Sequence, residues 1–281
     1  MMTRPVVALT AVLAIGSPQA LSGQNWKTVS ASRAAQGEEH LEVSVTYGVG
    51  ELRLSAGPDD LLYRTRLTFD EDAATPVHEY RDGELHVGIS QYRGNALRFK
   101  EWSSEGAFDV ELSPQVPMDL ELEFGAVQAD LDFTGLALTS LELETGASES
   151  AVHMDEPNVV TMDQASFHVG AADFNISGLG NFNARRISVE AGVGSVTLEL
   201  GGTWVQESEL DIEMGLGSLE LRIPRSLGVR LERSSFLTSM DTGGMVRRDG
   251  AFYSANWDGA ERKIDVEISA AFGSVDIVWI R

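Results

Sequence analysis

The chain has 281 residues, with 43 acidic against 21 basic side chains and a formal net charge of −22 at pH 7. So large a negative charge argues against binding to nucleic acid and against attachment to anionic lipid by charge. The sequence contains no cysteine, which excludes disulfide bonds and thiolate metal sites and argues against a lipid anchor on a cysteine.

Residues 1–23 are expected to be a signal peptide. Arg4 precedes an apolar run over residues 6–15, and small residues follow in SPQALSG. This run has about the length of a signal-peptide core and is too short to span a bilayer. No later stretch is long and apolar enough for a transmembrane helix. We therefore expect an exported protein that is not integral to the membrane and that lies in the periplasm, at the cell surface or outside the cell.

Residues 24–116 are predicted to form an N-terminal β region. Polar residues 24–40 precede a stretch of alternating apolar and polar residues at 41–56, and alternation returns at intervals between residues 61 and 112. Such alternation is typical of a strand with one buried face. Turn dipeptides separate the stretches, so this region is expected to contain irregular coils or hairpins.

Residues 117–281 are predicted to form a regular repeat, interrupted by a loop over residues 238–263. In LDIEMGLGSLELRI, apolar residues alternate up to Met214, Leu216 follows Gly215, and alternation resumes in the opposite phase at Leu219. A one-residue slip turns every later side chain to the other face of a strand. We therefore expect a corner at the glycine, with Leu216 and both flanking strands facing one core.

The same pattern recurs around six glycines, with Ala271 in the equivalent place near the end of the chain. Glycine suits a corner because it has no Cβ to obstruct a bend or the close approach of a neighbouring backbone. The last five glycines are 21 to 24 residues apart, a spacing typical of stacked repeats. The sequence thus predicts an all-β solenoid with a column of structural glycines: Gly48, Gly125, Gly146, Gly170, Gly192 and Gly215.

Two segments carry a resemblance to a known family. Residues 40–69, HLEVSVTYGVGELRLSAGPDDLLYRTRLTF, resemble the N-terminal domain of the bacterial toast-rack family. Residues 249–277 are similar to the C-terminal β region of sensors that respond to cell-wall-active antibiotics, and to candidate surface adhesins. The resemblance implies a single-stranded, right-handed β-helix in an envelope-associated protein, with no catalytic residues to carry over. This chain lacks the membrane helices of the sensors, which disfavours a direct sensing role.

The loop at 238–263 supplies one candidate binding site. It combines aromatic and charged residues of the kind that contact sugars or proteins: Arg247, Arg248, Tyr253, Trp257 and Asp258. The alternative is that this loop folds over the last repeat as a cap, with both aromatic rings half buried.

A second candidate is a ladder of outward residues two positions before the central glycines: Glu123, Glu144, His168, Glu190 and Glu213. If the repeats stack in register, neighbours in the ladder lie roughly 5 Å apart. Like charges at that distance repel by about 1 kcal/mol per pair in water. A divalent cation or a protonated His168 would relieve the repulsion; the alternative is an acidic face solvated by water.

The function expected from these features is non-catalytic, because no HExxH, GxSxG or phosphate-binding glycine motif occurs and no cofactor is implied. We predict an exported structural or adhesin-like interaction module at the bacterial cell envelope, with an envelope protein or polysaccharide as partner. One alternative is an envelope-stress regulatory domain that works through a membrane partner. Another is a polysaccharide-active enzyme on a β-helix, which would need carboxylates converging in a groove.

Overall fold

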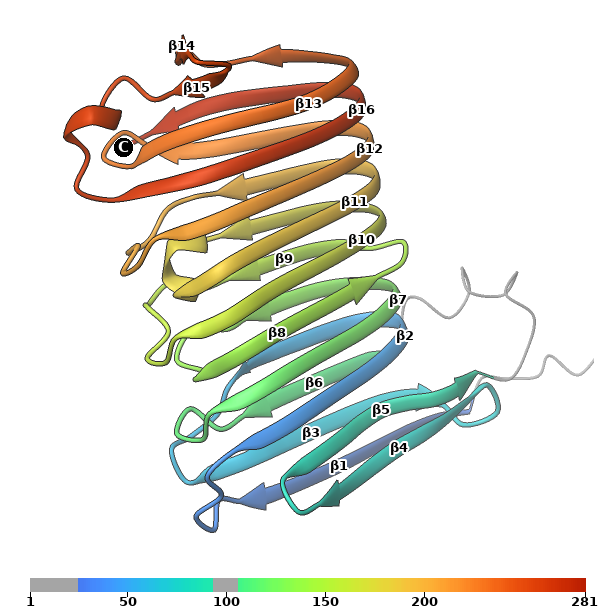
Figure 1. The fold of residues 1–281 in the computed structure, drawn as a ribbon. Helices are drawn as coiled ribbons and strands as arrows, with labels where there is room; N and C mark the ends of the chain where they lie inside the picture. The colour runs from blue at the N-terminus through green and yellow to red at the C-terminus, as the bar shows by residue number, and fades with distance from the viewer. Residues whose placement is uncertain (1–24, 93–105) are drawn as a thin grey trace, which may run out of the picture.

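The computed structural model describes residues 25–92 and 106–281 and confirms the all-β prediction (Figure 1). The expected signal peptide, residues 1–23, lies outside the described residues. Within the described ranges, no helix has the length and apolar character needed to cross a membrane. The elements are β1 (Trp26–Ala34), β2 (Leu41–Ala56), β3 (Leu61–Asp70), β4 (Ala74–Arg81), β5 (Glu84–Tyr92), β6 (Ala107–Leu112), β7 (Met118–Asp132), β8 (Leu138–Thr145), β9 (Glu149–His153), β10 (Met162–Ser177), the 3-10 helix η2 (Leu179–Phe182), β11 (Ala184–Glu199), β12 (Ser208–Pro224), β13 (Gly228–Asp241), β14 (Val246–Arg248), β15 (Ala251–Tyr253), the 3-10 helix η3 (Trp257–Gly259) and β16 (Lys263–Ile280).

The long strands stack as parallel layers. Strand β2 pairs with β7, β10 with β11, β11 with β12, β12 with β16, and β16 with β13, all in parallel. Strands β8 and β9 together form the layer between β7 and β10. Each long strand turns a corner near its middle, so its two halves lie on different faces of the stack (Figure 1).

The core lies between the two halves of these strands. In β12, Leu210 and Ile212 before the corner are at most 2 % exposed, and Leu219 and Leu221 after it are fully buried. The equivalent residues in the next layers are buried too, so side chains from successive layers stack into apolar columns that run along the whole stack. Because neighbouring strands pair in register, the alternating sequence places the charged neighbours of these core residues on the outer surface.

The glycines expected at the corners occupy equivalent positions in successive layers. The register of the flanking residues aligns Gly48 with Gly125 and Gly192 with Gly215. A Cβ at Gly192 would lie 2.7 Å from the carbonyl oxygen of Gly170 in the layer beside it. A side chain here would therefore force two hydrogen-bonded layers apart.

In β11, β12 and β16 the corner itself is made by a second glycine, whose role the alternation of the sequence does not predict. Gly194, Gly217 and Gly273 follow the first position by two residues, and their φ angles are +140°, +147° and +135°. Side chains with a Cβ are rarely found in this conformation.

The residue between the two corner positions points outward, contrary to the expectation for Leu216. Val193 is 50 % exposed, Leu216 52 % and Phe272 45 %. The positive φ turns the chain one residue later than expected, so this residue falls on the outer side of the corner.

The order of the layers differs from the order of the chain. The last strand, β16, lies between β12 and β13, so β13 and the antiparallel hairpin of β14 and β15 form the C-terminal end of the stack. At the other end, β4 pairs antiparallel with β5, and β1 and β3 continue antiparallel from β6. Arg233 stands opposite the buried Ile268 in the terminal layer, and a charge at a core position opposes the addition of a further layer.

Buried asparagines connect neighbouring layers where the chain passes from one to the next. Asn158 is 4 % exposed, and its Nδ2 donates to the carbonyl oxygens of Leu138 (2.7 Å) and Phe182 (3.2 Å). Its Oδ1 accepts the backbone N–H of Leu138 at 3.2 Å. Asn181 makes similar contacts one layer further on. These side chains satisfy backbone groups that the parallel ladders leave unpaired.

Candidate functional site

The residues of the predicted ladder stand side by side in the structure. Glu123 is in register with Glu144, Glu144 with His168, His168 with Glu190, and Glu190 with Glu213. The four glutamates are exposed, and His168 is half-buried. Beyond Glu213 the ladder continues as Ser269 and Ser234, so the negative charge ends two layers before the C-terminal end.

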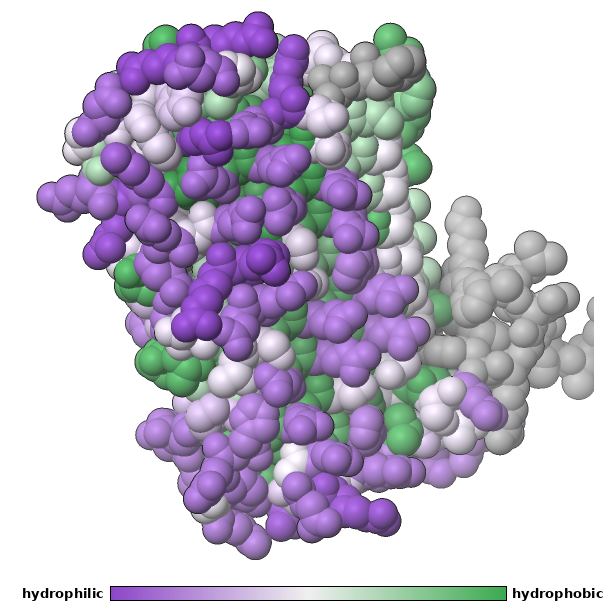
Figure 2. Space-filling view, in the orientation of Figure 1, coloured by the Kyte–Doolittle hydropathy of each residue, from purple (hydrophilic) through white to green (hydrophobic). Residues whose placement is uncertain are grey.

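The ladder borders a shallow groove of about 810 Å³ along the glycine column. The floor of the groove is backbone, because Gly170, Gly192 and Gly215 have no side chains to fill it. Figure 2 shows polar side chains over the face that the first halves of the strands form. We call the outward residues of these halves, from β2 to β16, the acidic face. Apolar side chains appear along the upper right edge, where the strands turn (Figure 2).

Contacts along the ladder are few. Nδ1 of His168 and Oε2 of Glu190 lie 3.3 Å apart, within reach of a hydrogen bond. Across residues 25–92 and 106–281, no three histidine or acidic side chains are grouped so that they could hold a metal ion. Binding of a divalent cation to the ladder therefore stays a prediction, and the positions of these side chains do not support it.

Most of the predicted loop residues meet at the C-terminal end. Strand β13 extends to Asp241, so the irregular part of the expected 238–263 loop begins after that residue. Nη1 of Arg248 donates to Oδ2 of Asp258 at 3.0 Å, and the rings of Tyr253 and Trp257 pack edge to face at 5.3 Å. Arg247 points elsewhere, with its guanidinium 5.9 Å from the centre of the Phe252 ring.

The hairpin also closes the stack. Ala251 and Ser254 are 3 % and 1 % exposed, and Oγ of Ser254 accepts the backbone N–H of Val229 at 2.9 Å. Tyr253 and Trp257 are half-buried, as the capping alternative expects. The remaining surface of both rings is open to solvent, so the same residues still present aromatic area to a ligand.

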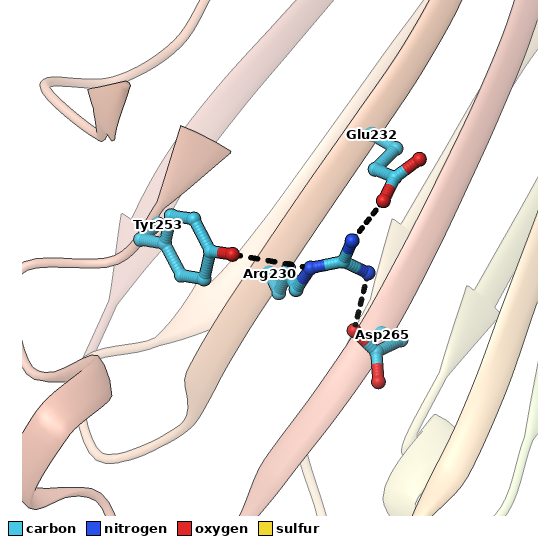
Figure 3. A network of polar contacts seen from close by, with 4 residues as sticks. All are labelled: Arg230, Glu232, Tyr253 and Asp265. Carbon is cyan, nitrogen blue, oxygen red and sulfur yellow. Dashed lines mark hydrogen bonds and ion pairs between the residues drawn. The ribbon is translucent and has the colours of Figure 1, made fainter. Parts of the chain in front are cut away.

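Arg230 holds this end together, and the sequence analysis did not single it out (Figure 3). Its guanidinium donates to Oδ1 of Asp265 at 3.0 Å, to the hydroxyl of Tyr253 at 3.2 Å and to Glu232. The hydrogen bonds with Asp265 and Tyr253 raise the pKa of Arg230. The partners come from β13, β15 and β16, so one side chain links the hairpin to the last two layers.

Charge is distributed unevenly along the stack. Residues 117–223 contain 19 acidic and 3 basic side chains, a net charge of −16. Residues 224–281, which we call the C-terminal tip, contain 8 basic and 8 acidic side chains and have no net charge. A strongly acidic body thus ends in a neutral tip, where a basic side chain without an acidic partner is less offset by neighbouring carboxylates.

The fold and the repeat define a class of all-β proteins in which glycine corners stack in parallel layers. The family model for the N-terminal domain of toast_rack, DUF2154, matches residues 22–176 and 158–222. The chain therefore belongs to the toast-rack family, as the resemblance in its repeats indicated. Among curated proteins, none matches this sequence.

Several solved structures are similar over almost the whole chain. A candidate cell adhesion protein from Clostridium sporogenes ATCC 15579 is 18 % identical, with a TM-score of 0.47, and the match covers 90 % of this chain and 100 % of that one. A candidate adhesin from Bacteroides fragilis NCTC 9343 is 12 % identical, with a TM-score of 0.38 and coverage of 90 % and 97 %. A candidate adhesin from Parabacteroides merdae ATCC 43184 is 10 % identical, with a TM-score of 0.30 and coverage of 90 % and 96 %.

Proposed function

We propose that this protein is an exported, non-catalytic interaction module of the bacterial cell envelope. In this proposal residues 1–23 direct export, residues 24–116 form the N-terminal β region, and residues 117–281 form the regular part of a right-handed β-helix. The acidic face binds an envelope component, such as a protein or polymer, that carries positive charge.

One observation carries the proposal: the strict register of the acidic face. Glutamates at equivalent positions recur in consecutive layers, about 5 Å apart. Backbone pairing holds this spacing, so the charges form a rigid, periodic surface that pays little entropy on binding. Mutual repulsion between these side chains is relieved when a cationic partner neutralises them.

The export part is tested by the N-terminus of the mature protein. The full chain is expressed in a bacterium with an envelope, cells are fractionated, and the N-terminal residue is sequenced. We expect an envelope or extracellular protein that begins close to residue 24. A cytoplasmic protein that retains Met1 refutes the export proposal.

The binding part is tested with matched charge variants and isolated envelopes. One variant replaces Glu123, Glu144 and Glu213 by glutamine; its control replaces Asp130, Glu149 and Asp173, exposed on the opposite halves of the strands, by the corresponding amides. Both lose three exposed charges, so we expect both to keep the fold. We expect the first variant alone to lose salt-sensitive sedimentation with envelopes. Equal binding by both variants contradicts a role for the acidic face.

A further inference from the structure

A cleft of about 520 Å³ opens at the side of the C-terminal tip. It lies between three segments: residues 202–204 between β11 and β12, residues 224–227 at the end of β12 and in the turn to β13, and residues 256–262, which include η3 and lead into β16. Its volume falls in the range of pockets that hold small ligands. None of the residues of the acidic face lines it.

The cleft is positively charged within a strongly acidic protein. Arg225 and Arg262 line it together, and Glu261 is the one acidic side chain among its lining residues. Other arginines nearby are neutralised: Arg222 pairs with Glu220 at 2.6 Å, and Arg248 with Asp258 at 3.0 Å. Neither Arg225 nor Arg262 forms an ion pair with any residue in the described part of the chain.

The backbone on both sides of the cleft is fixed. The N–H of Arg225 donates to the carbonyl oxygen of Ile280 at 3.2 Å, and the carbonyl of Arg262 accepts the N–H of Gly228 at 2.9 Å. The two side chains are exposed, so they contribute little to the core. Two arginines are thus held at one cleft without an internal partner, although carboxylates outnumber basic groups twofold in the chain.

The polar groups among the other lining residues match the hydroxyls of sugars. Thr203 offers a hydroxyl that donates and accepts, and Asn256 offers an amide with both functions. The indole of Trp204, 6 % exposed, forms part of the wall and is anchored because its Nε1 donates to the carbonyl oxygen of Leu200 at 2.9 Å. Trp204 is thus a rigid part of the wall, and the polar groups of the cleft are the ones that contact a ligand.

We propose that this cleft binds an acidic glycan, with Arg225 and Arg262 on the anionic group of one sugar unit. Guanidinium groups bind carboxylate and phosphate by paired, charge-assisted hydrogen bonds, and both groups occur on acidic polysaccharides. The two unpaired arginines of the cleft attract such a polymer, whereas the acidic body repels it. The site is separate from the acidic face, so this proposal goes beyond the proposed function and fails independently of it.

Calorimetric titration tests the proposal with four defined probes: tetragalacturonate, a glycerol phosphate oligomer, inorganic phosphate and the neutral sugar cellotetraose. We expect one of the two anionic oligomers to bind, more tightly than inorganic phosphate and with an affinity that falls as salt is added. Preference for tetragalacturonate identifies a carboxylate, and preference for the other oligomer a phosphate. Binding to neither oligomer, or equal binding of cellotetraose, overturns the proposal.

The variants locate the site. Joint substitution of Arg225→Ala and Arg262→Ala should raise the Kd for the preferred oligomer about tenfold or more, because two charge-assisted contacts are lost. The matched control is joint substitution of Arg66→Ala and Arg81→Ala, since both arginines are exposed at the opposite end of the stack and their loss removes the same charge. The Trp204 indole N–H resonance should shift on binding to the unmodified chain. Unchanged affinity in the double variant, or an equal loss in the control, refutes the assignment to this cleft.

Discussion

Substitution of the corner glycines by alanine tests the packing of the layers directly. At Gly146 an added Cβ would lie 3.3 Å from the carbonyl oxygen of Gly125, a close contact that a small shift relieves. At Gly192 the distance to the Gly170 oxygen would be 2.7 Å, too short for any relaxed contact. At Gly217 the Cβ would overlap the Gly194 carbonyl, and the φ of +147° is itself unfavourable for alanine.

The expected costs follow from these distances. Replacing glycine by alanine stabilises a protein by about 0.4–1 kcal/mol through the unfolded chain, where the native conformation permits it. An overpacked site costs about 1–3 kcal/mol, and a strained φ about 1–3 kcal/mol more. The net loss should be near zero for Gly146→Ala, about 1–2 kcal/mol for Gly192→Ala and about 3–5 kcal/mol for Gly217→Ala.

Gly259→Ala is the control, because a Cβ at this position meets no atom within 4 Å. Urea unfolding followed by circular dichroism gives the change in stability from the shift in midpoint. The order Gly259, Gly146, Gly192, Gly217 should appear as decreasing midpoints. If Gly217→Ala unfolds at the same urea concentration as Gly259→Ala, the corners do not limit how closely the layers approach.

Two further predictions concern polar contacts between layers. Asn158→Ala should lower the free energy of unfolding by about 2–4 kcal/mol, because it leaves buried backbone groups of Leu138 and Phe182 without partners. The control Asn175→Ala, at an exposed position in β10, should change it by less than about 0.5 kcal/mol. Equal urea midpoints for the two variants refute the role of Asn158 in joining the layers. Burial acts to raise the pKa of Asp119, but hydrogen bonds from Ser140, Thr139 and His40 outweigh it and lower the pKa overall. The ionised Asp119 therefore stabilises the fold fully above its pKa in the unfolded chain, about 3.9, and this stabilisation is lost as pH falls through the lower pKa of the folded state. In acid titrations, the stability advantage of the unmodified chain over Asp119→Asn should shrink below about pH 4. An advantage that grows with acid contradicts the shift.

Local pattern was a good guide to strands and a poor one to the corner. Alternation in 210–214 and 219–223 predicted two buried half-strands, and both are buried. The apolar character of Leu216 predicts a core position, yet the corner turns it outward. The signal was present in the GLGS and GVGS sequences, since a second glycine two residues after the first indicates a positive φ.

The candidate sites were predictable to the extent that register follows from the repeat. The ladder from Glu123 to Glu213 is predictable because its residues occupy the same position in each repeat. The contacts of Arg230 and the cleft of Arg225 and Arg262 are not predictable from the sequence, because the segments involved lie up to 60 residues apart in the chain, from Gly202 to Arg262. No period in the sequence relates those segments.

The sequence alone determined that this chain is all-β, that it belongs to a family of glycine-cornered repeats, and which side chains face the core in the half-strands on either side of each corner. The reason is that side-chain direction depends only on local alternation, and each repeat carries its own. The order of the layers was decided by the tertiary structure. Neighbouring repeats present nearly the same apolar surface and the same backbone edge, so local pattern does not say which layer lies next to which. Placing β16 between β12 and β13 leaves Arg233 and the β14–β15 hairpin at the end of the stack, where a charge at a core position is tolerated.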